Sequence, residues 1–187
     1  MKYRSQFLKA FLSDRNVASL TPTSRISVQK ICKKIDFERD RTIVEFGPGD
    51  GVFTKYLLKH MTPASRIIIF ETNKSFINEL EKIADPRLII LHQKAEEFTS
   101  AFKNMGIQSV DYVLSGIPFS FLKPTKRLQL LHDIAKALKP EGKAIIYQIS
   151  PLLLPYIQKV FPYRKYSLAW QNIPPLTIFE AWKHSKI

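Results

Sequence analysis

Residues 45–51, Glu45-Phe46-Gly47-Pro48-Gly49-Asp50-Gly51, follow a short apolar run at 42–46 and precede a helical pattern. Three glycines at alternate positions let the backbone turn tightly and approach a ligand closely. Glu71 ends the next apolar run, 20 residues after Gly51, and an acid at this place can accept hydrogen bonds from both hydroxyls of a ribose. The strand, the loop, the helix and this acid together favour a nucleoside-binding βαβ unit over a plain glycine turn.

The spacing of the glycines distinguishes between cofactors. A dinucleotide-binding loop has its third glycine three residues after the second, so that a helix N-terminus can hold a pyrophosphate. Here Gly51 comes two residues after Gly49, and Asp50 adds a negative charge that would repel phosphate. Pro48 also removes one backbone donor. The loop therefore favours a cationic nucleoside without phosphate, and S-adenosylmethionine is such a ligand.

Short β-branched runs alternate with helical patterns along most of the chain. Strands are predicted at 42–46, 66–71, 87–91, 110–114 and 143–149, and helices at 52–61, 75–83, 96–102 and 125–138, with a turn at 139–142. This order predicts βαβ units and five parallel strands. The runs at 163–170 and 176–182 have only a short loop between them, so they predict a terminal antiparallel hairpin in which Trp170 and Trp182 pack.

The chain has 187 residues and 21.7 kDa, which fits one domain. We expect an α/β fold in a single domain over 1–187, with two extra helices, 3–13 and 22–34, within residues 1–40 and a core at 41–187. The single cysteine, Cys32, excludes an internal disulfide, and with four scattered histidines it shows no metal-ligand spacing, so no metal is expected. The apolar runs are too short to span a bilayer, and the first residues lack the apolar core of a signal peptide. These features favour the cytoplasm.

The charge predicts a polyanionic partner. Lys and Arg number 29 against 16 Asp and Glu, a formal net charge of +13, which favours nucleic acid or an anionic membrane surface. At helical spacing, Tyr3, Phe7, Leu8, Phe11 and Leu12 fall on one apolar face. That face indicates either an interfacial helix or a helix packed on the sheet, and the charge favours the membrane. We therefore expect a peripheral protein at the inner membrane face.

The pattern Glu45-x-Gly47-x-Gly49-x-Gly51 resembles that of the class I S-adenosylmethionine-dependent methyltransferases over about residues 43–149. The resemblance implies a Rossmann-like, mostly parallel seven-stranded sheet ending in an antiparallel hairpin. It also implies that the methionine part of the cofactor lies along the glycine loop and that the ribose binds the acid after the second strand. By this resemblance the cofactor-binding residues are Glu45, Gly47, Pro48, Gly49, Gly51, Glu71, Thr72, Asn73 and Ser115. Lys94 replaces an acid that often faces the adenine, which leaves the Ala95 backbone or Glu96 for that contact.

The loop after the fourth strand, Ser115-Gly116-Ile117-Pro118-Phe119, lacks the amide or acid found in enzymes that methylate adenine. With Pro22-Thr23-Ser24-Arg25 and Ser150-Pro151-Leu152-Leu153-Leu154, it resembles the bacterial phospholipid N-methyltransferases over about residues 7–175. The resemblance implies methyl transfer to the amine of phosphatidylethanolamine or of another aminolipid. Residues 151–155 form either an apolar mouth for acyl chains or a turn in the core.

The acceptor amine is expected to meet Ser115, Gly116, Ile117 and Pro118, with Tyr147 as an orienting group or as an ordinary strand tyrosine. Tyr3 in the first helix is a further candidate. Two other functions stay open. One is methylation of adenine N6 in ribosomal RNA or another nucleic acid, which shares the glycine loop and the basic charge. The other is a non-catalytic membrane adaptor that binds the cofactor without turnover.

Overall fold

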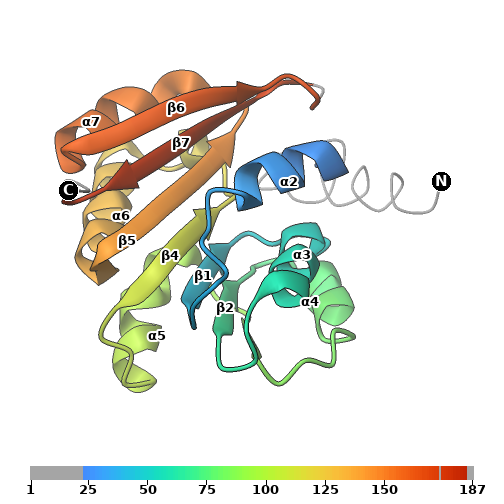
Figure 1. The fold of residues 1–187 in the computed structure, drawn as a ribbon. Coiled ribbons are helices and arrows are strands. Elements are labelled where there is room, and N and C mark those ends of the chain that lie inside the picture. The colour runs from blue at the N-terminus through green and yellow to red at the C-terminus, as the bar shows by residue number, and fades with distance from the viewer. Residues whose placement is uncertain (1–22, 173, 185–187) are drawn as a thin grey trace.

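The computed structural model describes residues 23–172 and 174–184, which form an α/β fold around one twisted sheet (Figure 1). The seven strands lie in the order β3-β2-β1-β4-β5-β7-β6. Their bounds are β1 Thr42–Phe46, β2 Arg66–Phe70, β3 Leu88–Leu91, β4 Val110–Ser115, β5 Leu138–Gln148, β6 Tyr163–Ala169 and β7 Leu176–Trp182. β1 to β5 run parallel, while β7 is antiparallel to both β5 and β6. The predicted fold class is confirmed, including the antiparallel hairpin.

Helices cover both faces of the sheet, as strands with two buried faces require. The helices are α2 Arg25–Cys32, α3 Val52–His60, α4 Lys74–Leu80, α5 Phe98–Asn104, α6 Pro124–Ala137 and α7 Leu154–Val160, with short 3₁₀ helices η1 Ala95–Glu97, η2 Phe119–Phe121 and η3 Pro151–Leu153. Residues of α2, α3 and α4 share one apolar core with the sheet, and residues of α5, α6 and α7 share the other. Figure 1 shows α6 and α7 behind β5 to β7.

Successive side chains along each strand point to opposite faces of the sheet and so belong to different cores. In β1, Ile43 packs with α2 and α3, whereas Val44 and Phe46 pack with α5 and α6. Glu45 therefore points to the Ile43 side and is completely buried there. The parallel arrangement also places the carboxyl ends of β1 to β5 at one edge of the sheet, where ligands bind in such folds.

Two sequence-based expectations differ from the structure, and a third is confirmed with a different beginning. The turn predicted at 139–142 lies inside β5, because Leu138 pairs with Val110 and Lys143 with Tyr112, so the residues between them bulge out of the ladder. The helix predicted at 96–102 starts as η1 and continues as α5, a common form of helix beginning. Trp170 does not pack in the hairpin: it is 67% exposed, because it follows β6, the edge strand.

The sequence analysis did not identify α7 or the neighbouring 3₁₀ helix η3. Residues 151–155 belong to these helices, in which Leu153 is buried in the core and Leu152 is 65% exposed. The stretch thus contains both a core contact and an exposed apolar residue.

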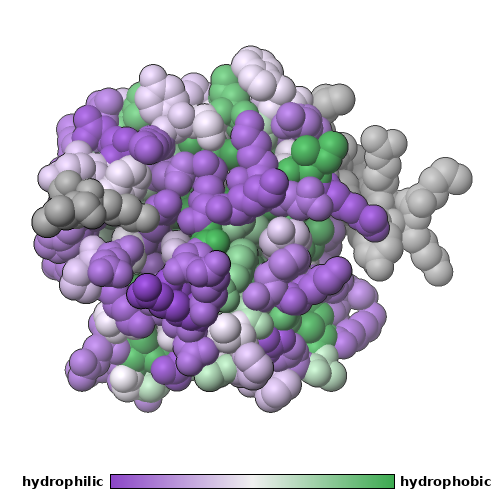
Figure 2. All heavy atoms as spheres, viewed as in Figure 1, coloured by the Kyte–Doolittle hydropathy of each residue, from purple (hydrophilic) through white to green (hydrophobic). Residues whose placement is uncertain are grey.

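The second predicted N-terminal helix is confirmed as α2, whose N-terminus is capped by Ser24, with Oγ accepting from the Ser27 N–H at 3.2 Å. The first helix, expected at 3–13, and its proposed membrane-facing residues lie outside the described residues. No helix in the described ranges has both the length and the apolar character to cross a bilayer. Figure 2 shows a largely hydrophilic face with small, separate hydrophobic areas.

Candidate functional site

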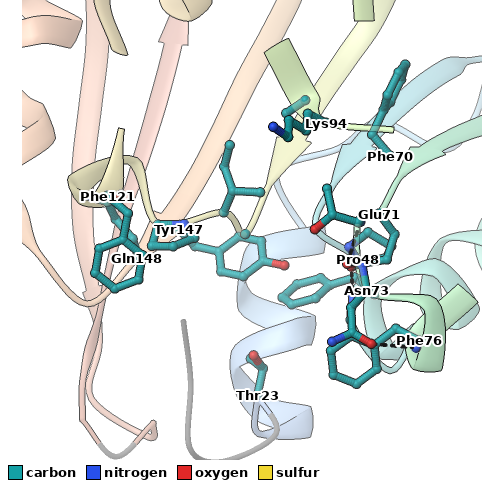
Figure 3. Close-up of a pocket in the computed structure, with 18 of the residues that line it drawn as sticks. Thr23, Pro48, Phe70, Glu71, Asn73, Phe76, Lys94, Phe121, Tyr147 and Gln148 are labelled. Carbon is teal, nitrogen blue, oxygen red and sulfur yellow. Dashed lines mark hydrogen bonds between the residues drawn. The ribbon is translucent and has the colours of Figure 1, made fainter. Parts of the chain in front are cut away.

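A cavity of about 410 Å³ lies at the edge of the sheet where β1, β2, β3, β4 and β5 end (Figure 3). This volume is ordinary for a small-molecule site. Twelve of the residues predicted for the site line the cavity: Gly47, Pro48, Gly49, Glu71, Thr72, Asn73, Ala95, Glu96, Gly116, Ile117, Pro118 and Tyr147. Lys94 lines it as well, at the position predicted to face the adenine. The structure therefore brings together the loops that the sequence analysis selected.

The glycine loop turns back against the loop after β4. Gly47, Gly49 and Gly51 all have positive φ, which favours glycine. A Cβ atom on Gly47 would lie 2.8 Å from Cγ2 of Ile117, so the two loops touch at a distance that only glycine allows. The Gly47 N–H donates to the Phe70 carbonyl at 2.9 Å, which ties the loop to the end of β2. These contacts fix the floor of the cavity.

Glu71 holds the same loop from the end of β2. Its Oε2 accepts from the Gly49 N–H at 3.2 Å, and its Oε1 accepts from the N–H groups of Thr72 and Asn73, both at 2.8 Å. Asn73 in turn caps α4, with its Oδ1 accepting from the Ser75 N–H at 2.9 Å. The carboxylate is thus fixed in a cavity wall, and Figure 3 shows Glu71 beside Pro48 and Asn73. It can accept hydrogen bonds from a bound polyol in this orientation.

Glu45 does not line the cavity and is buried beneath the glycine loop. Its Oε2 accepts from Thr54 Oγ1 at 2.6 Å, and its Oε1 has no hydrogen-bond partner among the described residues. Burial raises the pKa of Glu45 to about 8, with smaller contributions from the charges of Asp50 and Glu71, while the Thr54 hydrogen bond opposes the shift. Burial also raises the pKa of Asp50, which lines the cavity. A cationic ligand beside the carboxylates of Asp50 and Glu71 would stabilise their charged forms, so the residues present fit the charge of S-adenosylmethionine.

Two other predicted residues also lie behind the cavity wall. Gly51 begins α3, and a Cβ there would lie 2.8 Å from Cδ2 of Leu80, so its role is to let α3 and α4 pack closely. Ser115 is completely buried at the end of β4, and its Oγ has no partner in the described part of the chain. Neither Gly51 nor the Ser115 side chain lines the cavity.

The other end of the cavity is more apolar. Tyr147 lies between Phe121 and Gln148 on one side and Pro48 and Glu71 on the other (Figure 3). Its ring stacks on Phe53 with centroids 4.5 Å apart. Its hydroxyl makes no hydrogen bond with a described residue.

Gly116 is the neighbour of the Tyr147 hydroxyl. A Cβ on Gly116 would lie 2.5 Å from the phenol oxygen, so any side chain there would displace the tyrosine. Burial raises the pKa of Tyr147 well above its usual value, with the nearby acids adding to the effect. The phenol therefore stays protonated at neutral pH.

Two residues that the sequence analysis missed hold the loop after β4. Arg127 on α6 donates to three carbonyls of this loop: those of Phe119 at 2.9 Å, Ser120 at 3.2 Å and Leu122 at 3.1 Å. Gln148 accepts from the Phe119 N–H at 3.2 Å and donates to the Ser150 carbonyl at 2.6 Å. Both side chains are buried. No local sequence signal marks an arginine or a glutamine for this task, because the partners become adjacent only in the fold.

The Glu71 carboxylate predicts a measurable effect on cofactor binding. Glu71→Ala should weaken S-adenosylhomocysteine binding by roughly 1.5–3 kcal/mol, because a charged acceptor of hydrogen bonds is lost. Glu71→Gln should have an intermediate effect, since one amide oxygen still accepts. Isothermal titration calorimetry measures both, with Glu79→Ala, an exposed acid of α4, as the matched control. Equal affinity in Glu71→Ala and in the unmodified protein would show that the ribose binds elsewhere.

Glu45 predicts a pH-dependent stability. Its pKa is near 4.5 when unperturbed and about 8 in the fold, so between these values the folded protein holds a proton that the unfolded chain has released. The free energy of unfolding should therefore fall as pH rises through this window, by at most about 1.4 kcal/mol per pH unit. Glu45→Gln should remove this component, which urea unfolding at several pH values measures. Parallel pH profiles for the two proteins would contradict the prediction.

Comparison with known proteins agrees with this geometry. A family model described as a methyltransferase domain matches residues 43–142. The ornithine lipid N-methyltransferase of Singulisphaera acidiphila is 30% identical over 137 residues, which are 72% of this chain and 71% of that protein. The ribosomal RNA small subunit methyltransferase A of Lactococcus lactis is 22% identical over 91% of this chain, and the match spans only 46% of that enzyme.

A solved structure shows the same fold. The 1,6-didemethyltoxoflavin-N1-methyltransferase of Burkholderia thailandensis, crystallised with S-adenosylhomocysteine, superposes with a TM-score of 0.68 at 14% identity, covering 97% of this chain and 88% of that one. The match over residues 43–142 contains the glycine loop, Glu71 and the loop after β4. The chain therefore belongs to the methyltransferase domain family, the class I S-adenosylmethionine-dependent methyltransferases that its glycine loop resembles.

Proposed function

We propose that this methyltransferase acts on the amine of an aminolipid head group at a membrane surface. The observation that carries the proposal is the composition of the cavity around Tyr147. There the walls are Gly116, Ile117, Pro118, Phe121 and Ile149, and the tyrosine supplies a hydroxyl that makes no hydrogen bond with a described residue. Such a site suits a small amine attached to an apolar molecule. The relative named ornithine lipid N-methyltransferase supports the same class of acceptor.

The cofactor would occupy the opposite, acidic end. In this arrangement the ribose hydroxyls would donate hydrogen bonds to Glu71, and Thr72 and Asn73 would lie beside the ribose. The methionine part would lie along the glycine loop, above Glu45. The adenine would lie near Ala95 and Glu96, with Lys94 at the rim. When bound, the cofactor supplies a methyl group activated by a sulfonium. Tyr147 and Gly116 line the apolar end, where the acceptor nitrogen would have to be.

Positioning accounts for most of what the residues would do for the reaction. The attacking amine must be neutral, and apolar walls disfavour its ammonium form. Because the Tyr147 phenol stays protonated, it cannot be the base at neutral pH. Its oxygen can accept a hydrogen bond from the amine N–H and so direct the nitrogen lone pair towards the methyl group. The carbonyls of residues 115–117 are the other acceptors in this loop.

Adenine in RNA is the second candidate, supported by the match to ribosomal RNA methyltransferases and by the charge of +13. A base taken from its stack is read by hydrogen bonds along its edge. The amide of Gln148, the residue after Tyr147, lines the cavity, and both its oxygen and its nitrogen already bind the backbone. The lipid is therefore the better fit.

A labelling experiment distinguishes the two acceptors. The protein is incubated with methyl-labelled S-adenosylmethionine and, separately, with detergent-dispersed total lipid or with total RNA. The proposal predicts label in an aminolipid and none in RNA. Label in RNA alone would overturn the aminolipid assignment and establish the second candidate.

The geometry at Tyr147 predicts a specific pair of variants. Tyr147→Phe keeps the ring stacked on Phe53 and removes the hydroxyl, so kcat/KM for the acceptor should fall about 10- to 100-fold. Gly116→Val should abolish transfer, because its side chain fills the space next to the phenol. Both should keep the affinity for S-adenosylhomocysteine, which calorimetry measures. Retained transfer in Gly116→Val would place the acceptor elsewhere.

A further inference from the structure

Exposed apolar side chains gather around the mouth of the cavity. Of the nine large hydrophobic residues that are exposed in the described part of the chain, five lie outside the strands, on loops and helices near this edge of the sheet. We call them the apolar rim: Ile26, Phe121, Ile149, Leu152 and Trp170, which are 60%, 60%, 41%, 65% and 67% exposed. Single exposed apolar residues are ordinary, but a group around one cavity marks an interaction surface.

The fold brings the rim residues together at one edge. Phe121 and Ile149 line the cavity itself, and η2 and η3, which carry Phe121 and Leu152, contact each other. Trp170 follows Ala169, which pairs with the cavity-lining residue Leu176. Ile26 lies on α2 just after Ser24, whose N–H donates to Asn172 Oδ1 at 3.0 Å. The rim thus surrounds the acceptor end of the cavity.

The rim at η2 is rigid as well as exposed. Arg127 holds the carbonyls of Phe119, Ser120 and Leu122, and its guanidinium lies 4.7 Å from the ring centroid of Tyr156. Phe121 therefore projects from a short helix that is fixed on the inside by a buried cation. Because the backbone on both sides of Phe121 is already held, little backbone freedom is lost when the side chain inserts into a lipid surface.

The charge around the rim has one sign. Residues 23–35, 112–132 and 142–179, which carry all five rim residues, contain no Asp or Glu. Lys123 and Lys126 follow Phe121 and are exposed, and neither forms an ion pair with a described carboxylate. The three acids that line the cavity, Asp50, Glu71 and Glu96, lie at its cofactor end. A mixed apolar and basic border is complementary to an anionic lipid surface.

We infer that the apolar rim inserts into an anionic lipid surface, so that the acceptor end of the cavity opens onto the head groups. The inference rests on the proposed function. If the acceptor is a lipid, its head group would enter the cavity directly from the membrane surface. Aliphatic rim residues such as Leu152 and Ile149 cannot hydrogen-bond to a base or a phosphate, which favours lipid over nucleic acid as the occupant. Residues 1–22 join the fold at Thr23, which also lines the cavity.

Vesicle binding tests the inference without any acceptor amine. Vesicles of phosphatidylglycerol and phosphatidylcholine contain no primary amine, so binding does not depend on substrate recognition. Leu152→Ser/Trp170→Ser should lower the partition coefficient at least about tenfold, because two apolar side chains no longer insert. Met105→Ser/Tyr163→Ser is the matched control, since these residues are 37% and 41% exposed and Tyr163 lies at the opposite end of β6 from Trp170, and it should change binding less than about twofold.

Trp170 also reports its own location. In Trp182→Phe it is the only tryptophan, and on vesicle binding its emission should shift to shorter wavelength and be quenched by lipids with a doxyl group in the acyl chain. Solvent-like, unquenched emission in vesicle-bound protein would overturn the inference and assign docking to another segment, such as residues 1–22. Equal binding by the rim variant and the unmodified protein would also overturn it, as would RNA binding without vesicle binding.

The vesicle-binding experiment and the labelling experiment can fail independently of each other. Absent vesicle binding combined with label transfer to detergent-dispersed aminolipid would reject the docking surface and keep the proposed function. Vesicle binding through the rim combined with no label in lipid would keep the docking surface and reject the proposed acceptor.

Discussion

The carboxylate of Glu71 links the parts of the site. Through the N–H of Gly49 it fixes the glycine loop after β1, and through those of Thr72 and Asn73 it fixes the turn that begins α4. The glycine loop also contacts Ile117, so Glu71 is connected through this loop to the loop after β4. One acid thus holds together the two loops that form the cofactor end of the cavity.

The cavity has two ends of different chemistry. Asp50 and Glu71 line one end, with Glu45 buried beneath it, and burial raises the pKa of both Glu45 and Asp50. Apolar walls and one tyrosine hydroxyl form the other end. A cationic cofactor stabilises the charges at the first end, while a neutral amine suits the second. This division is what a transfer from a sulfonium to an amine requires.

Much of the fold and of the cavity could be predicted from the sequence, because the motifs that indicate them are short and contiguous. The glycine spacing, the acid after the second strand and the alternation of strands and helices predicted the fold, and the resemblance to known methyltransferases supplied most of the twelve cavity residues. The placements of Glu45, Gly51 and Ser115 behind the cavity wall depend on side-chain direction and packing, which spacing does not give. The sequence of residues 139–142 predicts a turn. In the structure they form a bulge within β5, because β5 pairs with β4 on both sides of them.

The contacts of Arg127 and Gln148 could not be predicted, because their partners are backbone atoms of segments that become adjacent only in the fold. The exposure of Trp170 likewise depends on strand order, in which β6 is the edge. The most direct test of the two-ended cavity is a crystal structure with S-adenosylhomocysteine. We predict both ribose hydroxyls within hydrogen-bond distance of the Glu71 carboxylate and the sulfur facing Gly116 and Tyr147. A nucleoside bound away from Glu71, or a sulfur directed away from Tyr147, would contradict this account.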